Sequence, residues 1–342
     1  MAEPARSDTS RTDIALELRG VNKTFRQRQR SGRMGDIVAG LIRPVYREIA
    51  ALRNIDLEVA RGAIVAYAGP NGAGKSTTVK IASGMLVPDS GTVRVLGMDP
   101  VRQREAYMSR AGVVFGQRTE LWMDHTVAAS YDWKRVVWDI PRERYDRMLA
   151  YVLDVLGIAE FYRTTVRELS LGQRMRADLG MALLHEPDIL FLDEPSLGLD
   201  VLAKRSMLDF IADLNRQRRV TVLVTSHDMA ELEQLAGRIV MIHRGEIAFD
   251  GPFDQLRREF ADRRVLRIDT DSPTAPVLPG ATLTESLGCR HEYAFDAGEA
   301  GIAELLACAA NQVALLDVET HRAPIDDVIA NIYVRWQERS RQ

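Results

Sequence analysis

Alternating apolar and polar positions predict the first strands of the chain. The residues from Ile14 to Val21 alternate in this way, and Ile55–Val59 repeats the period of two, which is typical of paired antiparallel strands. Ile64–Ala68 is an apolar strand, and a glycine-rich turn and a helical pattern over Lys75–Met85 follow it. The sequence therefore predicts a unit of strand, loop and helix after the antiparallel pair.

Two further apolar runs predict strands in the centre of a sheet. Ile189–Leu192 and Val220–Thr225 are separated by the helical pattern of Leu202–Arg218. Such alternation of buried strands and helices favours a mostly parallel sheet covered by helices. The expected fold class of the larger part of the chain is α/β.

The composition changes near Phe260, where we expect a second domain of the α+β class. Two short strands, Val265–Ile268 and Val313–Val318, and a helix over Ala303–Ala310 are predicted there. A chain of 342 residues has room for about two domains. The predicted organisation is a flexible tail over 1–12, a main domain over 13–260 with an insertion at 26–50, and an accessory domain over 261–342.

The charge balance excludes a strongly polyanionic or polycationic protein. Lys and Arg number 45 and Asp and Glu 48, so the net charge is −3, and we expect no direct nucleic-acid partner. One stretch is different, because 22–53 holds eight basic and two acidic residues. Within it Ile37, Val38, Leu41 and Ile42 have helical spacing, and Pro44 is expected to end this short amphipathic helix.

Cysteine usage and hydropathy point to the cytosol. The two cysteines, Cys289 and Cys308, form neither a metal-spaced pair nor a disulfide framework. No stretch reaches 18 consecutive apolar residues and the first residues are polar, so neither a membrane span nor a secretory signal is expected.

The strongest chemical signal is the segment Gly69–Ser76. It matches the pattern of Gly, four residues and Gly-Lys-Ser between a strand and a helix, a context that disfavours an ordinary glycine-rich turn. Its glycines let successive N–H groups point at phosphate oxygens, Lys75 should reach the β- and γ-phosphates, and Ser76 should bind Mg²⁺. The residues expected to contact the nucleotide are Gly69, Pro70, Asn71, Gly72, Ala73, Gly74, Lys75, Ser76 and Thr77.

Two carboxylates follow the apolar strand that begins at Ile189. Asp193 and Glu194 should emerge at the carboxyl edge of the sheet, where open α/β folds bind their ligands. Alone they could form a solvated acidic turn, but beside a phosphate loop they predict chemistry. Asp193 would bind Mg²⁺ and Glu194 would polarise the water that attacks the γ-phosphate.

These motifs resemble those of the ATP-binding cassette (ABC) ATPases over about 14–260. Leu169–Gln173 resembles the family's signature sequence, although Leu171 stands where glycine is usual, and Asp193-Glu194-Pro195-Ser196 resembles its Walker B motif. Gln117 resembles the Q-loop glutamine, Gly198-Leu199-Asp200 the D-loop, and His227 the switch histidine. The implied fold is a phosphate-loop ABC ATPase with a mostly parallel core sheet, an antiparallel β subdomain and a helical subdomain.

The resemblance implies how these residues act on ATP and Mg²⁺. Two cassettes, identical or paralogous, would form a head-to-tail dimer in which Ser170 and Gly172 of one close over the γ-phosphate held by Lys75 of the other. Alone, Ser170 would be interpreted as a helix N-cap and His227 as a turn or core histidine. Implied catalytic residues are Lys75, Gln117, Glu194 and His227; implied metal ligands are Ser76, Gln117 and Asp193; further nucleotide contacts are Gln173 and Asp200. Phe25 is the candidate for stacking on adenine, or it is a satellite core residue.

Transport is the favoured use of this ATPase. Ribosome-acting relatives resemble tandem cassettes and DNA-repair relatives insert long coiled coils, whereas this chain has one cassette and no sustained heptads. It would be the ATP-binding subunit of a transporter with separate multi-span permease subunits, peripheral on the cytoplasmic face of the membrane. The alternative is a non-transport ABC ATPase that regulates or remodels a macromolecular complex.

Two regions are candidates for docking. Leu121, Trp122, Tyr131, Trp133 and Trp138 would line a groove for the permease, or they belong to the core of the helical subdomain. The basic insertion would contact anionic lipid, the permease or the substrate, or it is a solvated loop. Together with the C-terminal domain, the insertion is similar to features of bacterial drug- and polysaccharide-export ATPases, which favours export of a substrate that the sequence does not identify.

Overall fold

The computed structural model describes residues 13–28, 46–116, 118–226, 228–260, 263–296 and 300–322, and six single positions between 325 and 336. The predicted tail, most of the basic insertion, Gln117 and His227 lie outside the described residues. The chain divides into two compact units, Met1–Asp250 and Gly251–Gln342.

The first unit is built on a six-stranded sheet of order β5-β6-β7-β3-β8-β9. The pairs β5–β6, β6–β7, β7–β3 and β3–β8 are parallel, as predicted. The strands are β3 (Ile64–Ala68), β5 (Ala111–Phe115), β6 (Ile189–Asp193), β7 (Thr221–Thr225), β8 (Arg238–His243) and β9 (Glu246–Gly251). Every residue of β6 and β7 is buried, because helices cover both faces of a parallel sheet.

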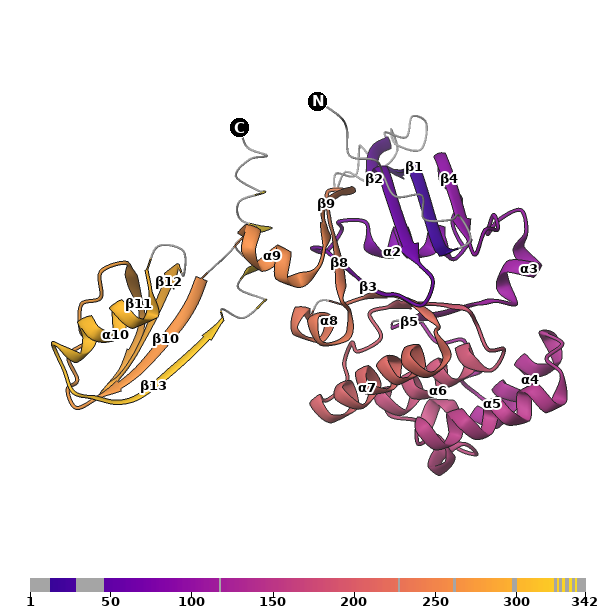
Figure 1. The fold of residues 1–342 in the computed structure, drawn as a ribbon. Coiled ribbons are helices and arrows are strands. Elements are labelled where there is room, and N and C mark those ends of the chain that lie inside the picture. The colour runs from indigo at the N-terminus through magenta and orange to yellow at the C-terminus, as the bar shows by residue number, and fades with distance from the viewer. Residues whose placement is uncertain are drawn as a thin grey trace, which may run out of the picture. The chain divides into compact units, whose positions relative to one another are not determined.

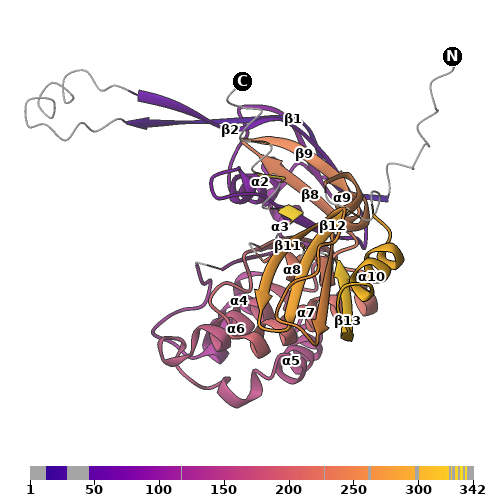
Figure 2. The same cartoon turned by 90° about the vertical axis from the view of Figure 1, so that its left-hand side faces the viewer.

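A three-stranded antiparallel sheet of order β2-β1-β4 lies on one side of this sheet (Figure 1). Its strands are β1 (Ile14–Arg28), β2 (Tyr46–Ala60) and β4 (Ser90–Val95). The predicted strands are confirmed, but β1 and β2 are longer, because the flanks of the insertion pair with each other from Lys23↔Leu52 to Arg28↔Tyr46. This two-stranded ribbon extends well beyond the sheet (Figure 2). The ends of the predicted insertion are therefore strand.

Helices α4 (Val127–Val137), α5 (Arg142–Val155) and α6 (Leu171–Leu183) form the helical subdomain on the opposite side (Figure 1). Tyr131 is fully buried there and its hydroxyl donates to the Ala177 carbonyl at 2.7 Å, so it is a core residue. The remaining helices of this unit are α2 (Lys75–Ala82), α3 (Arg104–Met108), α7 (Val201–Arg218) and α8 (Met229–Leu235). Helix α2 ends three residues earlier than predicted, and Gly84 follows with φ +67°.

The second unit is an antiparallel sheet of order β11-β12-β10-β13 with helices. Its elements are α9 (Phe253–Phe260), β10 (Arg263–Thr270), β11 (Ala281–Leu287), β12 (Arg290–Asp296), α10 (Ile302–Ala310) and β13 (Leu315–Arg322). Leu266, Ile268, Tyr293, Phe295 and Leu305 form its core. The α+β composition follows the prediction, and α9, which precedes the predicted boundary at 260, falls in this unit.

No helix in the described part of the chain is long and apolar enough to cross a membrane.

Candidate nucleotide-binding and hydrolysis site

The phosphate loop connects β3 to α2 and wraps around the Lys75 ammonium group. Lys75 is the first residue of α2 and is 5% exposed, and its Nζ donates to the carbonyl oxygens of Gly69 at 2.7 Å and Pro70 at 3.4 Å. Burial lowers the pKa of Lys75, and the nearby carboxylates of Glu194 and Asp193 partly offset this effect. The loop therefore holds a buried cation at its centre.

Close packing and backbone conformation both require glycine in this loop. A Cβ atom at Gly69 would lie 2.3 Å from the Ile242 carbonyl oxygen, and one at Gly74 would lie 2.7 Å from the Ala51 carbonyl oxygen. Gly72 and Gly74 also have φ of +78° and +119°, which L side chains rarely adopt. Substitution at 69 or 74 would push the loop off the sheet.

The loop presents a row of free donors. Within the described part of the chain, the backbone N–H groups of Gly72, Gly74, Lys75, Ser76 and Thr77 have no protein acceptor, and no side chain caps α2. Unpaired N–H groups and the positive end of a helix form an anion site. With the Lys75 charge beside them, these groups fit a chain of phosphates.

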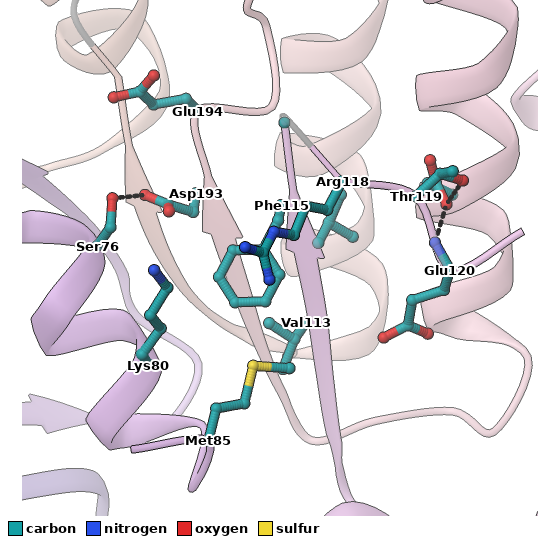
Figure 3. A pocket seen from close by; sticks show the side chains of 13 residues that line it. Ser76, Lys80, Met85, Val113, Phe115, Arg118, Thr119, Glu120, Asp193 and Glu194 are labelled. Atoms are coloured by element: carbon teal, nitrogen blue, oxygen red, sulfur yellow. Dashed lines mark hydrogen bonds between the residues drawn. The ribbon is translucent and has the colours of Figure 1, made fainter.

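Asp193 at the end of β6 faces the loop. The hydroxyl groups of Ser76 and Thr225 donate to its Oδ1 at 3.2 and 2.8 Å, and the Ser76 contact is visible in Figure 3. A hydroxyl and a carboxylate are hard oxygen ligands that suit Mg²⁺. Within the described residues no group of three or more His, Cys, Asp or Glu side chains could hold a metal ion alone, so Mg²⁺ here would also need phosphate oxygens.

Glu194 is held in an uncommon backbone conformation. Its φ is +56°, and its N–H lies 3.1 Å from the carbonyl oxygen and 3.0 Å from the Oγ1 of Thr225. A non-glycine residue in the left-handed region indicates strain that surrounding contacts must maintain, as is common at functional sites. The double contact from β7 supplies that support, and the sequence did not reveal this role of Thr225.

Gly116 brings the segment before Gln117 onto the two carboxylate residues. Its N–H donates to the Asp193 carbonyl at 2.7 Å, and a Cβ atom on it would lie 2.2 Å from the Glu194 carbonyl oxygen. Only glycine fits there. Gln117 follows Gly116 in the sequence, and His227 follows Ser226, two positions after the end of β7.

A pocket of about 340 Å³ opens beside these groups (Figure 3). Ser76, Asp193 and Glu194 line it from the core. From the other side it is lined by Thr119, in the segment between β5 and α4, and by Asp178 of α6. Asp178 accepts hydrogen bonds from the Thr119 hydroxyl at 2.8 Å and the Glu120 N–H at 3.1 Å. Asp178 thus ties the segment after Gln117 to α6.

The signature segment is the start of α6. Ser170 is the N-cap: its Oγ accepts from the Gln173 N–H at 3.2 Å, and the Gln173 Oε1 accepts from the Ser170 N–H at 2.9 Å. Ser170 therefore caps α6, and its predicted contact with the γ-phosphate stays a prediction. The unusual Leu171 packs on the D-loop, because a Cβ atom at Gly198 would lie 2.5 Å from its Cδ2.

Two further predicted contacts lie on the edges of the site. Asp200 is exposed and caps α7 by accepting from the Ala203 N–H at 2.9 Å. Phe25 is 41% exposed on the ribbon, opposite Ile49. Its neighbour Lys23 pairs with Leu52, which packs on Gly74 of the phosphate loop.

A phosphate loop between a strand and a helix, with a carboxylate of the neighbouring strand against its serine, defines a phosphate-loop nucleoside triphosphatase. The sequence model described as "ABC transporter" matches residues 52–197. The chain is 31% identical over 208 residues to the ABC transporter ATP-binding protein NatA of Bacillus subtilis, covering 61% of this chain and 84% of that protein. It is 35% identical over 220 residues to the daunorubicin resistance ATP-binding protein DrrA3 of Streptomyces coeruleorubidus, covering 64% and 69%.

Solved structures show the same fold. An ATP-binding subunit of an ABC transporter has a TM-score of 0.59 at 24% identity, over 72% of this chain and 93% of that chain. The post-hydrolysis dimer of the cassette MJ0796 has a TM-score of 0.58 at 23% identity, over 69% and 98%. The chain belongs to the ABC transporter ATP-binding family, and the predicted fold and resemblance are confirmed: it is an ABC ATPase.

Asp178 gives this site a testable pH dependence. Burial raises the pKa of its carboxyl to about 6, and the hydrogen bond from Thr119 only partly lowers it. Because the folded-state pKa exceeds the unfolded one, the contribution to stability is complete at acidic pH and is lost as the pH rises through 6. Asn cannot titrate, so Asp178→Asn removes this loss. Between pH 5 and pH 8 the free energy of unfolding should therefore fall by about 1 kcal/mol more in the wild type than in Asp178→Asn. Urea unfolding at both pH values measures this difference, and the exposed Asp209→Asn variant is the control. An equal change in unfolding free energy between pH 5 and pH 8 in the two variants would contradict the prediction.

Proposed function

We propose that the chain hydrolyses Mg-ATP in a head-to-tail dimer and thereby drives transport through separate membrane subunits, with export as the direction. The observation that carries the hydrolysis step is the contact of Ser76 with Asp193, next to the strained and doubly supported Glu194. The donors of the phosphate loop would hold the phosphates in front of this cluster.

Each residue then has a distinct task. Lys75 and the free N–H groups would bind the β- and γ-phosphates and balance charge as it develops. Ser76, Asp193 and Gln117 would hold Mg²⁺, whose charge polarises the phosphate oxygens when it is bound. Glu194 would accept a proton from the attacking water, and His227 would contact the γ-phosphate. Phe25 would stack on the adenine base.

Exposed apolar residues support a second cassette as the dimer partner. Leu197, Val201 and Leu202, which flank Asp200, are 41%, 81% and 78% exposed. A Cβ atom at Gly172 would lie 3.6 Å from Leu199, so the D-loop and the signature segment form one surface. Covering this surface with a second copy would remove these side chains from water and bring Ser170 and Gly172 to the partner's phosphates.

A second exposed cluster supports docking on a permease. Trp122 and Trp133 are 38% and 37% exposed with ring centroids 5.0 Å apart, and Met123 beside them is 39% exposed. Exposed aromatic and methionine side chains of this kind are typical of interfaces. Export is supported by the likeness to the daunorubicin resistance protein.

The docking surface can be tested with a double variant. Trp122→Ala with Trp133→Ala should lower recovery of the chain on inverted membrane vesicles about tenfold or more, because truncated aromatic anchors typically cost over 1 kcal/mol. Soluble ATPase activity should stay at the wild-type level. The Val155→Ala variant, at a residue 45% exposed on α5, serves as the control. Unchanged recovery of the double variant would refute this surface.

The transport function is tested by identifying the membrane partner. A tagged Glu194→Gln chain, purified from detergent-solubilised membranes with Mg-ATP, should bring down a multi-span membrane protein. Reconstitution of that complex in vesicles should give substrate-stimulated ATPase activity with the wild-type chain. Recovery of soluble complexes alone would favour the alternative, an ABC ATPase that remodels another macromolecule.

A further inference from the structure

Glu231 is a buried carboxylate that the proposed reaction does not use. It lies in the first turn of α8, is 7% exposed, and its N–H donates to the side chain of the N-cap Asp228 at 3.2 Å. Burying a carboxylate is costly unless it is paired and hydrogen-bonded. Its partners therefore show what it holds in place.

The two oxygens of Glu231 bind three different segments. Oε2 accepts from the hydroxyl groups of Ser196 at 2.6 Å and Ser226 at 3.2 Å. Oε1 lies 2.9 Å from the Nζ of Lys204, which is also 3.4 Å from Asp228. The Lys204 pKa is raised, chiefly by its close contact with Glu231, as expected of a specific ion pair.

Each partner stands beside a residue with a proposed role in hydrolysis. Ser196 is two residues after Glu194, and Ser226 immediately precedes His227. Lys204 lies in the first turn of α7, which Asp200 of the D-loop caps. The Lys204 N–H donates to the Asp200 carbonyl at 2.9 Å, which fixes their spacing. One carboxylate thus connects the ends of β6 and β7 with the start of α7.

Helix α8 has a cap and apolar contacts of its own besides Glu231. Capping by Asp228 already fixes the start of α8, and α8 packs on α7 and β3 through Met229, Leu232 and Leu235. The hydroxyls of Ser196 and Ser226, which converge on one oxygen, are instead spaced to align the two loops that carry Glu194 and His227. The N–H of Asp228 donates to the Ser226 Oγ at 3.0 Å, so this alignment includes the residue after His227.

We propose that Glu231 is a positioning residue for ATP hydrolysis, which holds the turn after Glu194, the segment of His227 and the D-loop helix in one register. This role rests on the proposed functions of Glu194 and His227. It assigns Glu231 no contact with nucleotide: the carboxylate acts through the backbone segments that it connects. Its loss should therefore lower kcat and leave nucleotide affinity unchanged.

The test compares Glu231→Gln with Glu246→Gln in the full chain. Glu246 is an exposed residue, paired with Arg53 at 3.9 Å, and its variant should have wild-type kinetics. In Glu231→Gln the amide oxygen can still accept from Ser196 and Ser226, but the NH₂ group then faces the Lys204 ammonium and the link to α7 is lost. We therefore expect Glu231→Gln to lower the kcat of ATP hydrolysis about 10- to 100-fold, since small misplacements of catalytic groups have effects of this size. The Kd for a fluorescent ATP analogue should remain unchanged. Equal kcat values for the two variants, or a matching loss of affinity and kcat in Glu231→Gln, would overturn the proposal.

Two variants of Ser196 keep the test decisive if Glu231→Gln does not fold. Ser196→Thr keeps the hydroxyl that binds Glu231, whereas Ser196→Ala removes it. The alanine variant should lose kcat at unchanged Kd and the threonine variant should retain it; equal kcat values in both would overturn the proposal. Glu194→Gln separates the proposed hydrolysis function from the positioning role of Glu231. Full ATPase activity in Glu194→Gln would reject the proposed function itself. An inactive Glu194→Gln together with a fully active Glu231→Gln would reject only the positioning role.

Discussion

Glu194→Gln should lower ATP turnover about 10²- to 10⁴-fold, or about 3–5 kcal/mol in the activation barrier. The amide retains the size of the side chain but cannot accept a proton from water. The backbone of residue 194 is held by Thr225 through its N–H, a contact that the substitution preserves. The loss should therefore fall on chemistry, with nucleotide affinity retained.

The same variant should accumulate as an ATP-bound dimer. ATP would still bridge the phosphate loop of one copy and the Ser170 segment of the other, and slow hydrolysis would prevent reopening. Size-exclusion chromatography with Mg-ATP measures this state. Asp193→Asn should behave differently, because Asp193 accepts from Ser76 and is the proposed metal ligand, so weaker Mg²⁺ binding would reduce closure itself.

The proposed division of labour between these adjacent carboxylates fails in two cases. One is a Glu194→Gln protein that hydrolyses ATP at the wild-type rate. The other is a Glu194→Gln protein that remains monomeric with Mg-ATP even when its membrane partner is supplied. Asp209→Asn, at an exposed position of α7, gives a control, since it removes a carboxylate that has no proposed role in hydrolysis or dimerisation.

Much of the core and the phosphate site could be predicted because their signals are local. The glycine-rich segment between β3 and α2 is specified by neighbouring residues, and the continuous apolar pattern of β6 and β7 marks strands buried on both faces. The Asp193 carboxylate follows directly from the end of such a strand. These elements need no knowledge of distant contacts.

The parts that were missed depend on contacts between distant segments. The extension of β1 arises from pairing with β2 across the insertion, as in Phe25↔Ile49, and neither flank alternates clearly by itself. The packing of Leu171 against Gly198 and the convergence of two serines on Glu231 likewise depend on how β6, β7 and α8 meet. A single sequence gives the types of these residues but not their distances.

The sequence also could not tell the exposed Trp122 and Trp133 from the buried Tyr131. The aromatic residues after position 117 could line a docking groove or fill the helical core, and the sequence treats them alike. In the structure Tyr131 is fully buried, whereas Trp122 and Trp133 remain over one-third exposed. For Tyr131 and Trp133 exposure depends on the rotation of α4 against α6, which periodicity over eleven residues defines only coarsely, and Trp122 lies in the segment before α4.

Lys75→Ala should abolish the stabilisation of the fold by nucleotide. At a concentration of 100 times Kd, a ligand that binds only the folded state stabilises it by about 2.7 kcal/mol. Lys75 is the buried cation that we propose binds the β- and γ-phosphates, and its Nζ also donates to the Gly69 and Pro70 carbonyls. Its loss should therefore both remove a cation and loosen the loop. The expected result is a thermal shift with Mg-ATP that disappears in the variant.

Lys80→Ala is the matched control for this prediction. Lys80 lies on the same helix and lines the pocket, but its side chain does not lie within the phosphate loop. Lys80→Ala should keep most of the thermal shift with Mg-ATP, whereas Lys75→Ala should lose it. Removing the buried Lys75 ammonium group also removes its desolvation cost from the protein without nucleotide, so the lost shift would not reflect a less stable fold. A Mg-ATP shift that survives Lys75→Ala undiminished would mean that the phosphates bind elsewhere.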